Sequence, residues 1–435
     1  MNPSLALYRT LTAAAEVAAF PWERAAQRAG GDRAARFGHG EARGATWIHA
    51  ASVGEVGAAA PLVRAFGAHR PGDDRLVSAG TPGGLAAWRR ELERRPAGMA
   101  PATVVAWPLD FPHAVRRAFE RRAPRRLLVV ETEIWPNALT EAFARGVRVA
   151  FASARLSARS WGRMRLLSPM LAPLLSRVTA CAAQSEGDAA RFLALGVPRD
   201  ALTVTGNTKF DAAIVPPVAG ERAAARAAAG LAAETVLVAW GNLRPGEEAA
   251  LAMLGRGLTA WAKAAGRRVA FVVVPRHPER GVTIATAAAR AGVRLVAWAP
   301  GRPWPMGDES ASITMAWAPV LGVLRDAYAM ADVAVVGGTF APYGGHNAAE
   351  PAALGVPVVV GPHHATTLDA VRALVARDAG HVAADAADAV GAIARWSATP
   401  AALARAGDCA RRTVQSLAGA SARTIGFLEA RGFWG

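Results

Sequence analysis

Short apolar runs alternate with helical stretches rich in alanine and arginine along the whole sequence. Runs such as LLVV (127–130) and FVVV (271–274) are apolar at consecutive positions, which is typical of strands buried on both faces of a parallel sheet. This alternation predicts an α/β protein with doubly wound parallel sheets. The expected strands lie near residues 46–51, 75–79, 103–107, 127–130, 147–152, 178–183, 202–205, 235–240, 269–274, 293–298, 332–336 and 356–360.

The length of 435 residues predicts two domains, because a single hydrophobic core rarely grows that large. The segment IVPPVAG (214–220) carries adjacent prolines between the two halves and is the expected linker. The expected domains are therefore residues 1–213 and residues 221–435. Ligands bind at the carboxyl ends of parallel strands, so two such domains facing each other suit an enzyme that joins two bulky substrates. The arrangement does not by itself identify the reaction.

Cysteine and charge content narrow the class of protein. The two cysteines, Cys181 and Cys409, are far apart, so neither a disulfide framework nor a thiolate metal site is expected, and a reducing, cytoplasmic compartment fits. The net charge is +16, but no basic motif with interleaved aromatic residues is present, and we expect no nucleic-acid partner. An anionic membrane surface or an anionic lipid substrate accounts for the basic excess.

The N-terminal stretch LALYRTLTAAAEVAAFPWERAAQRAG (5–30) predicts a mildly apolar helix that is broken by Arg9 and Glu16 and followed by Pro21-Trp22. It lacks the basic start and cleavage site of a secretory signal, and no run of 18 apolar residues occurs in the sequence. Two interpretations stay open for this helix. It either lies on a bilayer surface with Trp22 among the headgroups, or it caps the first domain. In the first case Arg9, Arg24, Arg28, Arg33 and Arg36 are expected to meet an anionic bilayer.

The stretch WIHAASVGEVGAAAPLVRAF (47–66) begins as a strand and ends as a helix, with Glu55 at the join. In many α/β proteins, the bare backbone N–H groups of such a join bind a phosphate. This sequence has a negative side chain there instead. Glu55 is therefore either a partner of the helix dipole or a chemically active carboxylate.

Two further segments of the first half carry charged residues at expected strand ends. ETEIWPN (131–137) follows a buried strand, and its Glu131 and Glu133 are either active-site acids or solvated loop charges. TGNTKFD (205–211) contains Lys209, one of only two lysines in a chain that otherwise uses arginine. A compact ammonium approaches a single oxygen more closely than a flat guanidinium can.

The second half contains two segments that favour nucleotide-sugar binding. VVVPRHPER (272–280) ends a strand at Pro275, and Arg276 is either a phosphate ligand or an ordinary loop cation. VVGGTFAPYGGHNAAEPAALGVPVVVGPHH (335–364) runs from a strand through a glycine-rich loop into a helix expected to open at Asn347. Its amides can bind a phosphate and Glu350 can bind a ribose diol, although a tight turn with a helix cap explains the pattern too.

In order and spacing, these segments resemble the 3-deoxy-D-manno-octulosonic acid (Kdo) transferases of lipid A biosynthesis. The resemblance rests on SVGE, ETEIWPN, ARLSARS, TG..KFD, VPRHPER, GGHN..EPAA and GPH. It implies a GT-B fold with CMP-Kdo as the donor and a lipid A precursor as the acceptor. The first domain would bind the acceptor and the second would bind the donor. The location implied is the cytoplasmic face of the inner membrane, as a peripheral or monotopic protein.

The resemblance also implies roles for individual residues. Glu55 would be the general base of an inverting transfer, kept ionised by the helix terminus, while Glu131 and Lys209 would stabilise the transition state. The residues implied in CMP binding are Pro275, Arg276, Leu321, Gly322, Val323, Asn347, Ala348, Ala349 and Glu350. No metal and no other cofactor is expected, since the sequence has no paired-acid motif for one and basic groups can carry the phosphate charge.

Two departures from the family pattern concern the donor side. The sequence has NLRPGEE (242–248) where the family usually has STHxGEE, with Arg244 in place of the histidine. It has PVLGVL (319–324) where the family usually has DTxGEL, with Val323 in place of the glutamate. Two alternatives therefore stay open: a GT-B enzyme with another donor or reaction, such as a nucleotide-sugar 2-epimerase, and a non-catalytic relative that binds membrane lipid.

Overall fold

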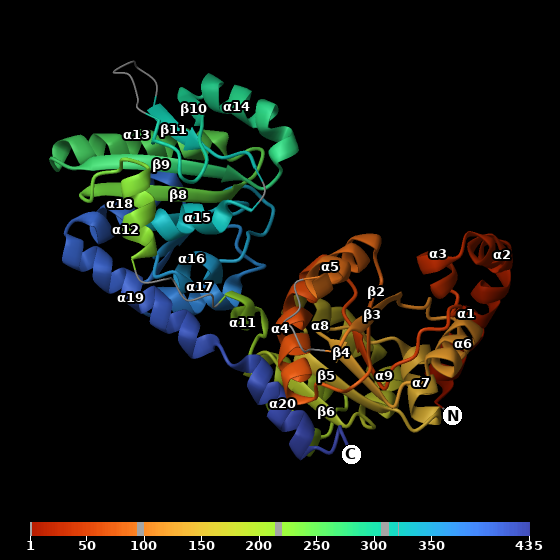
Figure 1. Cartoon of the computed structure of the whole chain (residues 1–435). Helices are drawn as coiled ribbons and strands as arrows, with labels where there is room; N and C mark the ends of the chain where they lie inside the picture. Colours follow the sequence, from red (N-terminus) through yellow and green to blue (C-terminus); the bar gives the residue numbers. More distant parts are fainter. Residues whose placement is uncertain (1, 94–99, 214–219, 306–312, 321) are drawn as a thin grey trace. The chain divides into compact units, whose positions relative to one another are not determined.

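The computed structural model describes residues 2–93, 100–213, 220–305, 313–320 and 322–435. It divides into two compact units (Figure 1). The first unit contains Met1–Ala212 and Leu417–Gly435, and the second contains Ala213–Ser416. The expected linker falls on residues 214–219, which lie outside the described residues.

The first unit is built on a seven-stranded sheet in the order β3-β2-β1-β4-β5-β6-β7, and all its strand pairs are parallel. Its strands are β1 (Thr46–His49), β2 (Arg75–Ala79), β3 (Ala102–Ala106), β4 (Arg126–Val130), β5 (Arg148–Ala154), β6 (Ala180–Ala183) and β7 (Leu202–Val204). All seven strands expected in this half are confirmed. Successive residues of one strand enter different cores: Leu127 and Val129 pack on one face, and Leu128 and Val130 pack on the other.

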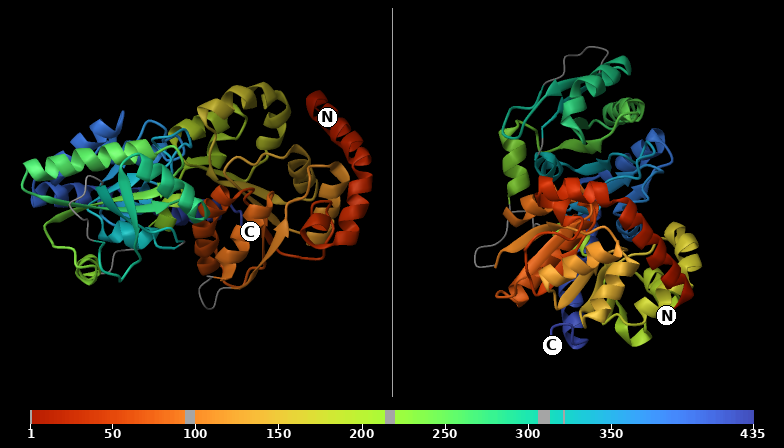
Figure 2. Two further views of the ribbon diagram at one scale, coloured as in Figure 1. Left: turned by 90° about the horizontal axis from the view of Figure 1, so that it is seen from above. Right: turned by 90° about the vertical axis from the view of Figure 1, so that its right-hand side faces the viewer.

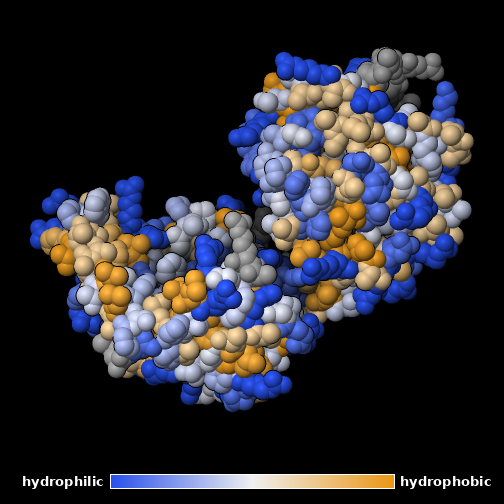
Figure 3. Space-filling model, turned by 180° about the vertical axis from the view of Figure 1, so that it is seen from behind, coloured by the Kyte–Doolittle hydropathy of each residue, from blue (hydrophilic) through white to orange (hydrophobic). Residues whose placement is uncertain are grey.

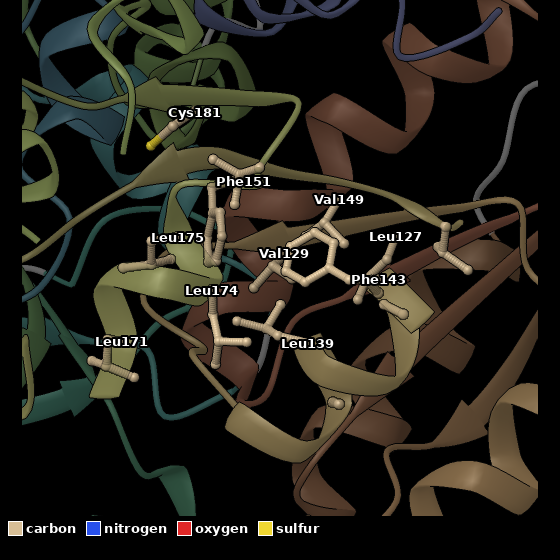
Figure 4. Packing of buried hydrophobic residues seen from close by; sticks show 14 of the residues in the cluster. Leu127, Val129, Leu139, Phe143, Val149, Phe151, Leu171, Leu174, Leu175 and Cys181 are labelled. Atoms are coloured by element: carbon tan, nitrogen blue, oxygen red, sulfur yellow. The ribbon is translucent and has the colours of Figure 1, made fainter. Parts of the chain in front are cut away.

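Helices cover both faces of this sheet (Figure 2). They are α1 (Pro3–Ala18), α2 (Phe20–Ala29), α3 (Gly31–Ala35), α4 (Val53–His69), α5 (Pro82–Glu93), α6 (Pro112–Arg122), α7 (Pro136–Ala144), α8 (Ala158–Met164), α9 (Ser168–Leu175), α10 (Glu186–Ala194), α11 (Lys209–Ala213) and α20 (Ala420–Ala430), with short 3-10 turns η1 (Arg165–Leu167) and η2 (Arg199–Ala201). On one face, side chains of α7 and α9 pack against those of β4 and β5 (Figure 4). This core explains why those strands are apolar at consecutive positions.

The second unit has its own seven-stranded parallel sheet, in the order β10-β11-β9-β8-β12-β13-β14. Its strands are β8 (Thr235–Leu243), β9 (Arg268–Pro275), β10 (Val293–Ala297), β11 (Ile313–Trp317), β12 (Val333–Val336), β13 (Val358–Val360) and β14 (Gly380–Val382). Its helices are α12 (Glu221–Ala228), α13 (Glu248–Ala264), α14 (Gly281–Arg290), α15 (Leu324–Met330), α16 (Ala349–Ala353), α17 (Leu368–Val375), α18 (Ala386–Ser397) and α19 (Pro400–Leu417), with the 3-10 turn η3 (Pro278–Arg280). The α/β class with parallel, doubly wound sheets is confirmed for both units.

Two strands of the second unit, β11 and β14, were not anticipated from the sequence. The β11 sequence ITMAW is short and comes directly after a polar stretch, and the β14 sequence GHV is a three-residue edge strand containing glycine. Both lack the long β-branched runs that mark the other strands of this sheet.

The C-terminal residues differ from the expected domain boundary. The second domain was expected to run to residue 435, whereas Leu417–Gly435 belong to the first unit. Arg423 Nε of α20 donates to the Thr205 carbonyl at 2.9 Å, and Thr424 Oγ1 lies 2.9 Å from Thr205 Oγ1. Phe433 is fully buried in the first-unit core. An apolar pattern tells that a segment is buried, but it does not tell in which core.

The N-terminal helices are fastened to the first unit and also expose apolar side chains. Tyr8 Oη donates to Asp110 Oδ2 at 2.9 Å, and the buried Glu16 accepts hydrogen bonds from the backbone N–H groups of His113 and Ala114 at the start of α6. Large apolar side chains of α1 and α2 remain exposed, and Figure 3 shows hydrophobic groups at the edge of the unit where these helices lie. They are Leu7, Leu11, Val17, Phe20 and Trp22. Among the described residues, no helix is long and apolar enough to cross a bilayer.

Candidate active site

Glu55 lies at the join of β1 and α4, as the sequence predicted. Its carboxylate turns back to the residues before the helix. Oε2 accepts the Ala51 backbone N–H at 2.7 Å, and Oε1 accepts the Ser52 hydroxyl at 3.0 Å. Ser52 is the N-cap of α4, and this Ser-x-x-Glu arrangement is a variant of the capping box. The first-turn Glu thus stabilises the helix start and stays partly exposed.

The acid strength of Glu55 differs from the expectation. Burial raises the pKa of Glu55 to about 7, the charges of Glu133 and Glu131 act in the same direction, and the hydrogen bonds from Ala51 and Ser52 oppose the rise. The helix terminus was expected to keep this carboxylate ionised, and the rise of its pKa runs against that expectation, because desolvation is the largest cause. A carboxylate with a pKa near 7 is well matched to proton transfer at neutral pH.

Glu131 and Lys209 come from different strand ends and form an ion pair. Glu131 follows β4, Lys209 begins α11, and Lys209 Nζ donates to Glu131 Oε1 at 2.6 Å. Glu131 has a φ of 61°, a left-handed conformation that is costly for a glutamate. Backbone strain of this kind concentrates at functional sites. The structure therefore brings together two of the residues that the sequence singled out.

Glu133 and His49 form a second contact beside this pair. His49 is fully buried, stacks on Trp107 with ring centroids 3.9 Å apart, and has Nδ1 3.1 Å from Ser78 Oγ. Its Nε2 lies 3.8 Å from Glu133 Oε2 and has no hydrogen-bond partner among the described residues. Burial would raise the pKa of Glu133, but His49 and the hydrogen bond from Trp135 together lower it.

Sequence reasoning missed His49. Its only signal was one polar residue in the otherwise apolar strand WIH, and a lone histidine is not specific. Together, Glu55, Glu131, Glu133 and Lys209 form what we call the acidic cluster, at the carboxyl edge of the first-unit sheet. The cluster can accept a proton at Glu55 and can place a cation, Lys209, beside a reacting oxygen.

In the second unit, Arg276 directly follows β9, which ends at Pro275. The Arg276 backbone N–H donates to the Leu243 carbonyl at 3.0 Å, while its side chain is exposed. The charge of Arg276 also lowers the pKa of Glu350, although burial dominates and raises it. Both residues therefore lie at the carboxyl edge of this sheet, where α/β proteins bind their ligands.

The glycine-rich loop after β12 already holds a carboxylate of the protein itself. Glu247 is fully buried and accepts the backbone N–H groups of Gly338 and Thr339 at 2.8 and 3.0 Å. It also accepts those of Phe340 and Arg244, each at 2.9 Å. Successive backbone N–H groups of this kind form an anion-binding nest. Because Glu247 fills this nest, these backbone N–H groups are not free to bind a phosphate.

Helix α16 begins at Ala349, two residues later than expected, and has five residues. Asn347 and Ala348 precede it in the loop. The backbone N–H of Ala348 donates to Thr367 Oγ1 at 3.0 Å, and that of Ala349 donates to Asn347 Oδ1 at 3.1 Å. The sequence pattern did not reveal that side chains satisfy these amides, so a phosphate here would have to displace them. Asn347 Nδ2 also donates to Glu350 Oε1 at 3.3 Å and thereby fixes that carboxyl.

The segment PVLGVL (319–324), for which the resemblance implies CMP binding, is described only in part. Leu321 lies outside the described residues. Gly322 is exposed with a φ of 92°, and Val323 is the N-cap of α15. Among the residues that the structure does describe, no group of three or more His, Cys, Asp and Glu side chains could hold a metal ion.

Comparison with known proteins gives a consistent result. A family model described as 3-deoxy-D-manno-octulosonic-acid transferase (kdotransferase) matches residues 26–212. The chain is 37% identical over 418 residues to a 3-deoxy-D-manno-octulosonic acid transferase of Bordetella pertussis, with 94% of each chain covered. It is 30% identical over 327 residues to the protein of the same name in Haemophilus influenzae, covering 73% of this chain and 70% of that one. Among solved structures, a UDP-GlcNAc 2-epimerase from Neisseria meningitidis superimposes with a TM-score of 0.58 at 14% identity, over 88% of this chain and 99% of that chain.

Proposed function

The chain belongs to the 3-deoxy-D-manno-octulosonic acid (Kdo) transferase family, and from this premise we propose that it transfers Kdo from CMP-Kdo to a lipid A precursor with inversion. Its two parallel-sheet units have the GT-B fold, and it is a Kdo glycosyltransferase of lipopolysaccharide biosynthesis. The observation that carries the finer proposal is the acidic cluster, in which Glu55 has a pKa near 7.

In the proposed reaction, Glu55 removes the proton from the acceptor hydroxyl as its oxygen attacks the anomeric carbon of Kdo. The new carbon–oxygen bond forms on the face opposite the phosphate, and the bond to the phosphate oxygen breaks, so the anomeric configuration inverts. CMP leaves with the bonding electrons, and the proton stays on Glu55. Lys209, held by Glu131 at 2.6 Å, supplies a fixed positive charge for the oxygens that gain charge in the transition state.

On the donor side, Arg276 is the proposed phosphate ligand, and Glu350 is the proposed ribose ligand. Pro275, Asn347, Ala348 and Ala349 belong to the same proposed site, while Gly322 and Val323 would face the cytosine. No metal is part of this proposal, because one phosphate next to Arg276 requires less positive charge than a pyrophosphate does. Val323 offers no carboxylate, so the base is expected to bind less tightly than the family pattern implies.

The acceptor is a membrane lipid, and the N-terminal helices are the proposed membrane contact at the cytoplasmic face of the inner membrane. The exposed apolar residues of α1 and α2 suit the headgroup region, and Arg9, Arg24, Arg28 and Arg33 suit anionic lipid. Arg36 is removed from this set, because its Nη1 donates to the Gly80 carbonyl at 2.5 Å and it is partly buried. The same helices cap the unit, so the two interpretations of this segment are compatible.

The direct test is incubation of the full chain with CMP-Kdo and a tetraacyl lipid A precursor, with the product read by mass. We expect a lipid heavier by one or more Kdo residues, and CMP should stabilise the protein against heat more than UDP or GDP does. Absence of a Kdo-bearing product, combined with the strongest protection by UDP, would contradict the proposal and favour an epimerase.

Membrane contact is tested separately by flotation with vesicles. Recovery should rise with anionic lipid and fall with salt, and replacing Leu7 and Leu11 with serine should reduce it. Equal recovery of the wild-type and variant proteins would show that α1 is only a structural cap.

A further inference from the structure

Arg244 stands where the family usually has histidine. Its side chain is held in place by a neighbouring histidine and not by a carboxylate. Arg244 Nη1 lies 2.6 Å from His277 Nε2, and His277 Nδ1 lies 2.9 Å from Glu279 Oε1. Because a guanidinium only donates, His277 Nε2 accepts from Arg244, and His277 Nδ1 is left to donate to Glu279. Among the described residues, Arg244 makes this contact with a histidine and no ion pair with a carboxylate.

One edge of the Arg244 guanidinium remains unused. Nη1 faces His277, whereas Nε is buried without a hydrogen-bond partner among the described residues. The guanidinium carbon lies 4.2 Å from the ring centroid of Tyr343, an exposed residue whose hydroxyl donates to the Pro245 carbonyl at 3.1 Å. The free edge, formed by Nε and Nη2, is the edge that binds a carboxylate through two parallel hydrogen bonds.

His346 lies next to Arg244 and is likewise unpartnered. Its Nε2 is buried and has no hydrogen-bond partner among the described residues. A Cβ added at Gly338 would lie 3.3 Å from His346 Cδ2 and 3.5 Å from Arg244 Cγ, so the two side chains flank the same glycine. Burial, followed by the charges of Arg276 and Arg244, lowers the pKa of His346 to about 4. The space beside Gly338 therefore has a positive field.

The positive field beside Gly338 is not offset by a hydrogen bond from the side chain of Arg244 or His346 to Glu247, because Glu247 is occupied by its nest of backbone N–H groups. Glu247 is a buried acid close in sequence to Arg244, but its two oxygens already accept four backbone N–H groups, and Glu350 accepts a hydrogen bond from Asn347. Buried charges in proteins are usually paired, and a buried unpaired cation indicates a ligand site. Arg276 is exposed and serves the phosphate in the proposed function. Arg244 is a second cation in this region, with a flat and partly buried guanidinium. A planar anion such as a carboxylate matches its geometry.

We propose that Arg244, with His346 beside it, binds the carboxylate of the donor's sugar acid, in a subsite distinct from the phosphate contact of Arg276. The inference rests on the proposed function, because CMP-Kdo carries both a phosphodiester and a sugar carboxylate. His277 is a positioning residue that holds Arg244 from behind. The subsite selects 2-keto sugar acids against neutral sugars carried by the same nucleotide.

The test uses the full chain saturated with CMP, titrated with free Kdo and with the methyl ester of Kdo, which lacks the negative charge. Binding is followed by calorimetry in the wild type, in Arg244→Gln and in Arg244→Lys. Arg290→Gln, an exposed arginine of α14, is the matched control. Thermal unfolding shows whether each variant is folded, and Arg244→Lys preserves the charge if the glutamine variant is unstable.

We expect Kdo to bind to the CMP-saturated wild type at least about tenfold more tightly than its ester does. Arg244→Gln should weaken Kdo binding by about 10- to 100-fold, the range for a charge-assisted hydrogen bond, and change CMP binding by less than about threefold. Arg244→Lys should be intermediate, and Arg290→Gln should match the wild type.

Two results overturn the subsite. One is equal binding of Kdo and its ester to the wild type. The other is a loss of CMP affinity in Arg244→Gln as large as the loss of Kdo affinity, which would make Arg244 a phosphate ligand. Failure of the proposed function looks different: no Kdo would be transferred from CMP-Kdo, while carboxylate-dependent binding of Kdo through Arg244 persisted.

Discussion

Glu55 and Glu247 occupy the same position in the topology of the two units and have different surroundings. Each lies at the start of the helix that follows the first strand of its unit: Glu55 is in the first turn of α4, after β1, and Glu247 is the N-cap of α13, after β8. Glu247 is fully buried and accepts four backbone N–H groups, whereas Glu55 accepts one backbone N–H and one hydroxyl and stays partly exposed. A glutamate at this join is structural when all its acceptor sites are used, and available for chemistry when they are not.

The neighbouring charges differ in the same sense. Glu55 is accompanied by Glu131 and Glu133, and their charges add to the burial that raises its pKa to about 7. Burial also raises the pKa of Glu247, but four backbone hydrogen bonds oppose it. Glu55 of the first unit is therefore a carboxylate with a pKa near neutral pH, and Glu247 of the second unit is a carboxylate that organises the loop after β12.

The largest expected effect is the loss of turnover in Glu55→Gln. The amide cannot take a proton from the acceptor, so kcat/KM should fall by about 10²- to 10⁴-fold, the usual contribution of a general base. Glu186→Gln, an exposed first-turn glutamate of α10, is the control and should transfer Kdo at the normal rate. Near-normal turnover of Glu55→Gln would show that Glu55 only stabilises the start of its helix. Glu55 and Glu247 would then both be structural.

The second effect is on stability and concerns Glu247→Gln. One amide oxygen can serve only part of the four N–H donors, and the amide NH₂ would face the others. Leaving two buried N–H groups unsatisfied should lower the free energy of unfolding of the second unit by about 2–5 kcal/mol. Urea denaturation measures this change, with the neighbouring Glu248→Gln as control, since Glu248 accepts the exposed Gly246 N–H and not the N–H groups of the buried nest. An unchanged unfolding midpoint in Glu247→Gln would show that the nest needs no anion.

The third effect is on pH dependence. With Glu55 as the base, kcat/KM should fall about tenfold per unit below pH 7 and level off above it. Because the folded pKa is raised from the ordinary 4.5 to about 7, the folded protein binds this proton more tightly than the unfolded chain does. Stability should therefore fall as the pH rises from about 4.5 to about 7, and Glu55→Gln should remove that fall. A rate profile flat between pH 5 and 7 would contradict this assignment.

The smallest effect on the pH profile concerns the ammonium in the acidic cluster, whose removal should also lower the rate because it stabilises the transition state in the proposed reaction. Lys209→Met leaves Glu131 unpaired, so its charge acts more strongly on Glu55 and should raise the pKa seen in kcat/KM by roughly half a unit to one unit. Lys263→Met, which changes the only other lysine, in the last turn of α13, is the matched control. A shift toward lower pH would mean that Lys209 does not compensate Glu131.

Much of the fold could be predicted from the sequence, because long β-branched runs separated by helical stretches specify parallel strands directly. The strands β11 and β14 could not, since short segments without such runs become strands only through their neighbours. The placement of Glu55, Glu131 and Lys209 at strand ends could be foreseen from spacing and resemblance. The roles of His49 and Glu247 could not, because they depend on burial and on partners distant in sequence.

The return of residues 417–435 to the first unit has a consequence for how the protein is made. The chain leaves that unit after Ala212 and comes back only at Leu417, so the 204 residues from Ala213 to Ser416 are translated between its two parts. At about 5–20 residues per second, this takes roughly 10–40 s. During that interval the emerging first unit lacks α20 and the aromatic side chains of Phe433 and Trp434, and part of its apolar core faces solvent. The nascent chain is then a natural client for chaperones, until the last segment closes the unit that was begun first.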